Sequence, residues 1–202
     1  MTVRSTIPRQ IGLLLVGALV SLSVAACDTP PQRQRFPEIT FQHLAPIRLD
    51  VAQIEIQSEY RSADHPDDNA GDYPEAPETL VADWARERLQ AAGERGQATY
   101  TVVQARAVRV PLPRSSGIGA ALKTEQSDRY DLAITVRLDA GNPISGKSGT
   151  VTETVTRSQT VPENMTLNQR EAMLFNLLDA AMKDLNQRLE KSIPQYLAPL
   201  IR

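Results

Sequence analysis

Few side chains in this sequence have the types and the spacing that chemistry requires. The chain holds one cysteine, Cys27, and two histidines, His43 and His65. Neither histidine has a ligand-like partner at helical spacing, and no nucleophile stands in a pattern with a base. We therefore expect solvated histidines, no catalytic site, no metal and no cofactor, so that the protein is not an enzyme.

The best pattern for a metal is the acidic stretch from Asp67 to Asp72. If Asp67 were the first ligand of an EF-hand loop, the glycine required at the sixth position would be Asp72, with Gly71 at the fifth. Only Glu78, at the twelfth position, fits. We expect residues 60–78 to form a solvated acidic loop, with calcium binding as the alternative.

The N-terminus has the residue order of a secretory signal. Arg4 and Arg9 precede an apolar run from Ile11 to Val20, and the small residues Val24-Ala25-Ala26 end directly before Cys27. A bilayer-spanning helix needs about 20 apolar residues, and this run is about half as long, which argues against a transmembrane anchor. The pattern resembles a bacterial lipoprotein signal, and that resemblance implies acylation of Cys27, with palmitate among its chains.

Removal of residues 1–26 as a signal peptide leaves about 176 residues, enough for one ordinary domain and a linker. Pro30, Pro31 and Pro37, among few apolar residues, mark residues 27–46 as a lipidated, stiff tether that reaches about 50–60 Å. Residues 47–202 are expected to form a single α+β domain. The formal net charge is −2 and no basic patch is present, so we expect no nucleic-acid partner.

Hydrophobic periodicity predicts the elements of that domain. Apolar residues alternate with polar ones in four stretches and recur at the helical period in two. The last helix begins with a capping box formed by Thr166 and Gln169. We expect strands at 47–56 (with a bulge near Ala52), 98–110, 129–140 and 147–161, and helices at 78–92 and 166–193, where Pro194 ends or kinks the helix. The order β-α-β-β-β-α predicts a two-layer sandwich, a four-stranded sheet with two helices on one face.

The hairpin of residues 129–161 carries the candidate docking surface. Pairing Ala140 with Lys147 would place Thr135 opposite Thr152, and Glu153 on the apolar face, as on an edge strand. The face away from the helices would then be open and polar. The residues on this face that we expect to bind a partner are Arg129, Asp131, Thr135, Arg137, Thr152 and Thr154.

Three families of small lipoproteins share this layout. The alternating strand at 125–136, the return strand at 151–157 and the long final helix resemble the small LPS-assembly lipoproteins (LptE-like), which plug an outer-membrane translocon. Residues 45–52 and Trp84-Ala85 are similar to an uncharacterised family of alphaproteobacterial lipoproteins. The ABC-transport auxiliary lipoproteins are a third group with a similar layout.

These resemblances imply a membrane-anchored protein that faces the periplasm. Asp28 follows the lipidated cysteine, and in enteric lipoproteins an aspartate at this position implies retention in the inner membrane. We therefore keep both the outer membrane and the inner membrane as alternatives for the anchor. We expect a non-enzymatic accessory subunit that is held by membrane lipid and docks onto a membrane protein. The alternative is a periplasmic module that binds a lipid or another apolar ligand. The apolar loop around Ile118 is a further candidate contact.

Overall fold

The computed structural model describes residues 35–113 and 126–202, which belong to one compact unit. The expectations for the signal peptide, Cys27 and the loop around Ile118 lie outside the described residues.

The centre of the fold is a four-stranded sheet in the order β2-β4-β5-β6. Its strands are β2 (Gln53–Ser58), β4 (Gln97–Pro111), β5 (Gln126–Asn142) and β6 (Lys147–Pro162). β2 runs parallel to β4, and the other neighbours are antiparallel. A second, two-stranded parallel sheet pairs β1 (Ile47–Leu49) with β3 (Leu89–Ala91).

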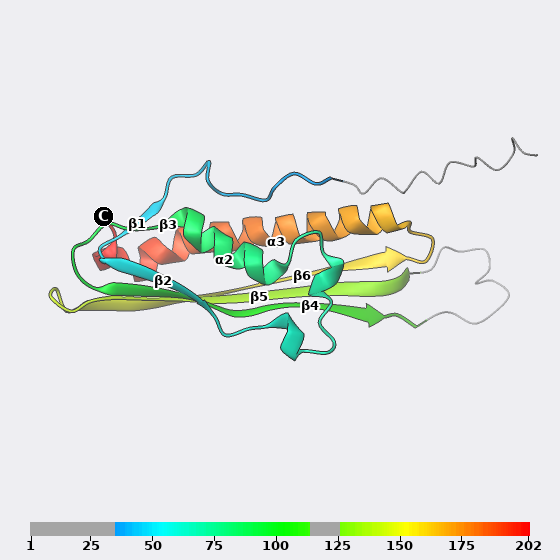
Figure 1. Cartoon of the computed structure of the whole chain (residues 1–202), viewed down its shortest axis with the longest axis horizontal. Helices are drawn as coiled ribbons and strands as arrows, with labels where there is room; N and C mark the ends of the chain where they lie inside the picture. The colour runs from blue at the N-terminus through cyan, green and yellow to red at the C-terminus, as the bar shows by residue number, and fades with distance from the viewer. Residues whose placement is uncertain (1–34, 114–125) are drawn as a thin grey trace, which may run out of the picture. The chain divides into compact units, whose positions relative to one another are not determined.

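Both long helices cover the same face of the four-stranded sheet (Figure 1). Helix α2 (Pro77–Arg88) packs on β2 and β4, and α3 (Leu167–Tyr196) lies along β6. The apolar stripe of each helix meets the inward side chains of the strands, which is why the two layers exclude water. The predicted α+β sandwich is confirmed. The largest fully buried side chains of this core include Trp84, Tyr100, Leu132, Ile134, Leu174, Leu178, Met182 and Leu185.

Two elements differ from the expectation because tertiary pairing overrides the local pattern. The predicted strand 47–56 is two strands in two different sheets, separated at Asp50–Ala52 rather than bulged. The first helix ends at Arg88 instead of residue 92, since Leu89–Ala91 leave it to pair with β1. After β3, Gly93 allows the chain to pass close to the segment that follows β1, because a Cβ at this position would lie 2.6 Å from the backbone of Asp50 and Val51.

The predicted register of the hairpin is wrong by two residues. Asn142, not Ala140, pairs with Lys147, so Thr135 faces Thr154 instead of Thr152. The Asn142 side chain accepts hydrogen bonds from the amides of Ile144 and Ser145, at 3.1 and 3.4 Å, which stabilises a shorter turn. Because the shift is an even number of residues, every side chain keeps its predicted face.

Helix α3 begins as predicted, with a reciprocal capping box between Thr166 and Gln169. It does not end at Pro194 but continues to Tyr196, and a 3-10 turn, η4 (Ala198–Leu200), follows. Beyond that turn, Ile201 bridges to Leu49, which ties the C-terminus to β1. No helix within residues 35–113 and 126–202 is long and apolar enough to cross a membrane.

The part of the expected tether that the structure describes packs on the folded unit. Ile39 and Phe41 are buried, and the ring of Phe36 stacks on Phe175 of α3 with 4.9 Å between centroids. Residues 36–44 therefore run over the helix layer, and the folded unit begins before residue 47.

Candidate functional site

On the side away from α2 and α3 the sheet is open over β5 and β6, and we call the β5 and β6 side chains on this side the open sheet face. Alternation along the two strands sends one residue in two to this side, where its side chain is exposed or half-buried. All six residues predicted for partner binding lie on it.

Arg129 and Asp131 form one polar group at one end of this face. The Arg129 guanidinium donates from Nε and Nη2 to the Asp131 carboxylate at 2.8–3.0 Å. The hydroxyl of Ser158 on β6 donates to the same carboxylate at 2.6 Å. Hydrogen bonds from Arg129 and Ser158 hold the pKa of Asp131 below its usual range, although partial burial opposes this.

Arg137 forms the second polar group, nearer the hairpin turn. Its guanidinium bonds Asp139 on the same strand and Glu59 after β2, each at 2.9 Å, and these carboxylates raise its pKa. Thr150 donates to Asp139 from the neighbouring strand at 2.6 Å. Arg129 and Arg137 therefore each form an ion pair with carboxylates of their own chain.

Hydroxyl groups occupy the space between these two polar groups. Thr135 and Thr154 face each other across the strands, with 3.0 Å between their Oγ1 atoms, and Thr152 is opposite Arg137. On β6 the hydroxyl side chains continue as one exposed row: Thr150, Thr152, Thr154, Thr156, Ser158 and Thr160. The open sheet face therefore presents paired charges and a line of hydroxyls, a surface suited to polar contacts.

The acidic loop is fastened to β4 through its own side chains. Asp67 forms an ion pair with Arg106, and Asp68 accepts from the Tyr60 hydroxyl and from the amide of Ala70. Asn69 exchanges hydrogen bonds with β4 as well. In the segments that the structure describes, no group of three or more histidine, cysteine or acidic side chains could hold a metal ion.

The two histidines lie apart and at the surface. His65 stacks on the Tyr60 ring with 4.8 Å between centroids, and His43 is exposed on the N-terminal segment.

Sequence reasoning missed the contacts that hold the N-terminal segment, which we call the N-terminal clasp: Glu87 and Arg88 with residues 40–45. The Glu87 carboxylate accepts from the Thr40 hydroxyl at 2.9 Å, the Phe41 amide at 2.6 Å and the Gln42 side chain at 3.1 Å. Arg88 is buried and donates to the carbonyl oxygen of Ala45. The clasp thus attaches the segment to α2 by four hydrogen bonds.

The clasp also joins the two helices. Arg88 reaches Glu190 of α3 at 2.5 Å, and the Asn186 side chain accepts from Trp84 Nε1 at 3.0 Å and from Arg88. A signal for this network was present in the sequence, since Arg88 and Asn186 fall on the apolar stripes of their helices. A polar residue on such a stripe is buried only if it finds a partner.

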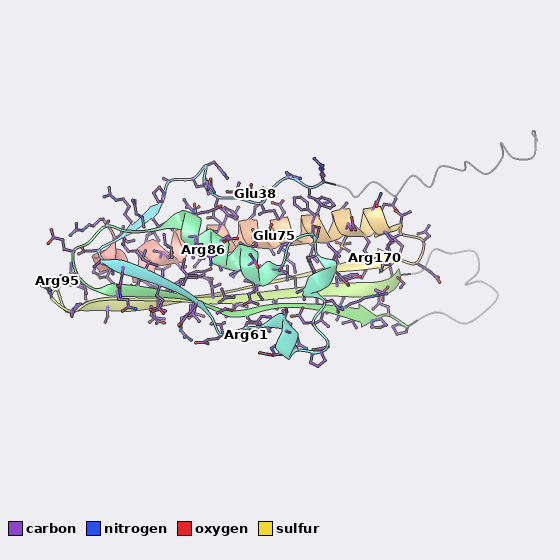
Figure 2. The ribbon with its side chains drawn as sticks, in the orientation of Figure 1. Glu38, Arg61, Glu75, Arg86, Arg95 and Arg170 are labelled. Atoms are coloured by element: carbon purple, nitrogen blue, oxygen red, sulfur yellow. The ribbon has the colours of Figure 1, made fainter. Side chains whose placement is uncertain are left out.

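Acidic side chains gather near the clasp. Figure 2 shows Glu38 and Glu75 on the helix side of the molecule. Burial raises the pKa of Glu75, and the negative charges of Asp83, Glu38 and Glu87 raise it further.

Comparison with known proteins gave structural likenesses only. No protein-family model matches the chain, and no curated protein matches it in sequence. Its fold is similar to a minor lipoprotein from Acinetobacter baumannii (14% identity, TM-score 0.35, covering 72% of this chain and 92% of that one). It is also similar to rare lipoprotein B from Shewanella oneidensis (13%, 0.29, 67% and 95%) and to an uncharacterized lipoprotein B from Nitrosomonas europaea (12%, 0.33, 68% and 81%). At these identities and TM-scores, the likenesses assign neither a family nor a function to the chain.

Proposed function

We propose that this protein is a non-enzymatic, lipid-anchored lipoprotein of the bacterial envelope, and that it acts as an accessory subunit which docks onto a membrane protein. The anchor is the acylated Cys27, which the order of positive, apolar and small residues before it supports. The domain then faces the periplasm.

The open sheet face is the observation that carries the docking role. Antiparallel sheets often leave one face to water, and a solvated face needs no particular side chains. Here, however, the side chains of β5 and β6 are fixed by cross-strand bonds, such as Asp131 to Ser158 and Asp139 to Thr150. Side chains that are already held in place lose little conformational entropy when a partner binds.

The packing between the layers favours docking over the alternative role of an apolar-ligand module. Trp84, Tyr100 and Leu178 fill the space between the helices and the sheet, and each is almost fully buried. A ligand between the layers would have to displace these side chains.

Photo-crosslinking in the native host tests the docking role. A photoreactive residue in place of Thr135, on the open sheet face, should form an adduct with one membrane protein. The same residue in place of Lys191, exposed on α3, is the control and should not form this adduct. Equal adducts from the two positions, or none from either, would contradict the proposal.

A further inference from the structure

Among the described strands, β6 has a partner on one side only. β6 is the last strand of the sheet, and its 16 residues pair with β5 alone among the described strands. An edge of this length presents a row of backbone N–H and C=O groups to which another strand can bond.

The half of β6 from Thr154 to Val161 lacks the features that usually block such an edge, which are lysine, proline and unpaired inward charges. Its one charged residue, Arg157, is held by Asp184 of α3, with its Nε 2.8 Å from the carboxylate. Glu153, the inward acid, precedes this half.

A groove follows the same half of the strand. It has a volume of about 440 Å³ and lies between residues 157–159 of β6 and the first half of α3. Its helix wall is largely apolar and includes Ala172, Met173, Leu177 and Ala180. Helix α3 therefore borders this part of β6 at the edge of the sheet, where no further strand lies among the described residues.

We propose that this edge accepts one extended strand of the partner protein, which pairs with residues 154–161 of β6 and lies against the groove wall. The inference rests on the proposed function, because the strand belongs to the same membrane protein. Alternate residues of the added strand face the apolar side chains of α3 in the groove wall, so they are apolar. The others continue the row of Thr154, Thr156 and Ser158, where threonine or serine pairs well.

A second copy of this chain does not fit the same edge. Pairing through two β6 strands would place the strands about 4.8 Å apart. Each copy would then bring its own α3 over the edge, where the first α3 already forms the groove wall, whereas packed helices need about 8–10 Å between their axes. The occupant is thus a strand that carries no helix on that side.

The test is photo-crosslinking of the full-length protein in the native host, from Asn176, which lines the groove. The partner peptide in the adduct is sequenced by mass spectrometry. We expect a segment in which apolar residues alternate with threonine, serine or other polar residues. An adduct with this chain itself, with a helical segment, or with no protein at all would overturn the inference.

A groove variant separates this inference from the docking role as a whole. Ala180→Glu places a charge in the apolar wall, and Gln195→Glu adds the same charge to an exposed position of α3 outside the groove. We expect Ala180→Glu to reduce the Asn176 adduct at least tenfold and Gln195→Glu to leave it unchanged. If Ala180→Glu has no effect while the Thr135 adduct persists, the partner docks without adding a strand.

Discussion

At the scale of single residues, Asp128 links the stability of the fold to pH. This buried carboxylate, at the start of β5, accepts from Arg109 at 2.9 and 3.1 Å and from Ser127 at 2.8 Å. The bonds from Arg109, and then from Ser127, hold its pKa below the usual range against the opposing effect of burial. A depressed folded-state pKa contributes stability above the unfolded-state value, about 3.9, and that stability is lost as the pH falls through the folded-state value.

We therefore expect the free energy of unfolding to decline below about pH 4, and Asp128→Asn to make this decline shallower. The variant should also cost about 1–3 kcal/mol at neutral pH, because it weakens hydrogen bonds to a charged partner. Urea unfolding at a series of pH values measures both effects. A pH dependence identical to that of the wild type would show that Asp128 does not contribute.

Removal of the hydroxyl should affect the free energy of unfolding differently at Tyr100 and at Tyr60. Tyr100 is fully buried and its hydroxyl has no hydrogen-bond partner in the described part of the chain, whereas Tyr60 donates to Asp68. We expect Tyr100→Phe to leave the free energy of unfolding unchanged or slightly raised. Tyr60→Phe should lower it by about 1–3 kcal/mol, since a bond to a carboxylate is lost. A loss from Tyr100→Phe of the same size would mean that its hydroxyl is bonded in solution.

At the scale of elements, the helix faces decide whether the core forms. Trp84 of α2 and Leu178 of α3 are each only 1% exposed, and Trp84 also bonds Asn186. Trp84→Ala and Leu178→Ala should each lower the free energy of unfolding by about 2–5 kcal/mol, because truncation leaves a cavity in the core. Denaturant midpoints equal to that of the wild type would contradict this assignment of the helix faces.

The contact between the end of α3 and β6 depends on a glycine. A Cβ at Gly149 would lie 3.0 Å from the Tyr196 carbonyl oxygen and 2.7 Å from Leu197 Cδ2, whereas one at Gly141 meets nothing closer than 3.8 Å. We expect Gly149→Ala to lower the free energy of unfolding by about 1–3 kcal/mol through overpacking. Gly141→Ala, the control in the neighbouring strand, should have a smaller effect. Thermal unfolding of the two variants makes the comparison, and equal losses would argue against the close approach.

Hydrophobic periodicity predicted the elements whose pattern is local. It failed where contacts with segments distant in the sequence determine the secondary structure. The alternation from Tyr130 to Leu138 and the stripe of α3 were sufficient to predict β5 and the long helix. The short pairing of β1 with β3 was not predictable, because it joins residues about 40 positions apart and competes with a local helical pattern. The register failed for a different reason: the local hydrogen bond from the Ile144 amide to the Asn142 side chain fixes the turn, and the alternation of apolar residues does not distinguish registers that differ by two residues.

The candidate site was also predictable only where it follows from the local pattern. The face of each side chain follows from alternation, so all six expected residues are on the open sheet face. Only some of their partners are local: Arg129 bonds Asp131 two positions along the strand, whereas Arg137 also bonds Glu59 from 78 positions away, and only the fold brings these two together. The N-terminal clasp was missed because Thr40 and Phe41 are also distant from Glu87 in the sequence, and only the fold brings them into hydrogen-bonding contact.

At the scale of the whole molecule, the packing of residues 36–44 on the helix layer shortens the tether. The expected reach of about 50–60 Å assumed that residues 27–46 are all extended. With Phe36 stacked on Phe175, eight residues separate Cys27 from the folded unit, and they span about 28 Å at most. Under the proposed function, the open sheet face and the β6 edge thus work close to the membrane that holds Cys27.

The anchor is the central claim, because docking onto a membrane protein presupposes it. The direct measurement is metabolic labelling with palmitate in the native host, applied to the wild-type protein and to Cys27→Ser, followed by fractionation. We expect labelled wild-type protein in the membrane fraction and no label on Cys27→Ser, because acyl chains contribute about 0.8 kcal/mol per buried methylene and need this thiol as their attachment point. Wild-type protein without label, or label that persists on Cys27→Ser, would contradict the account.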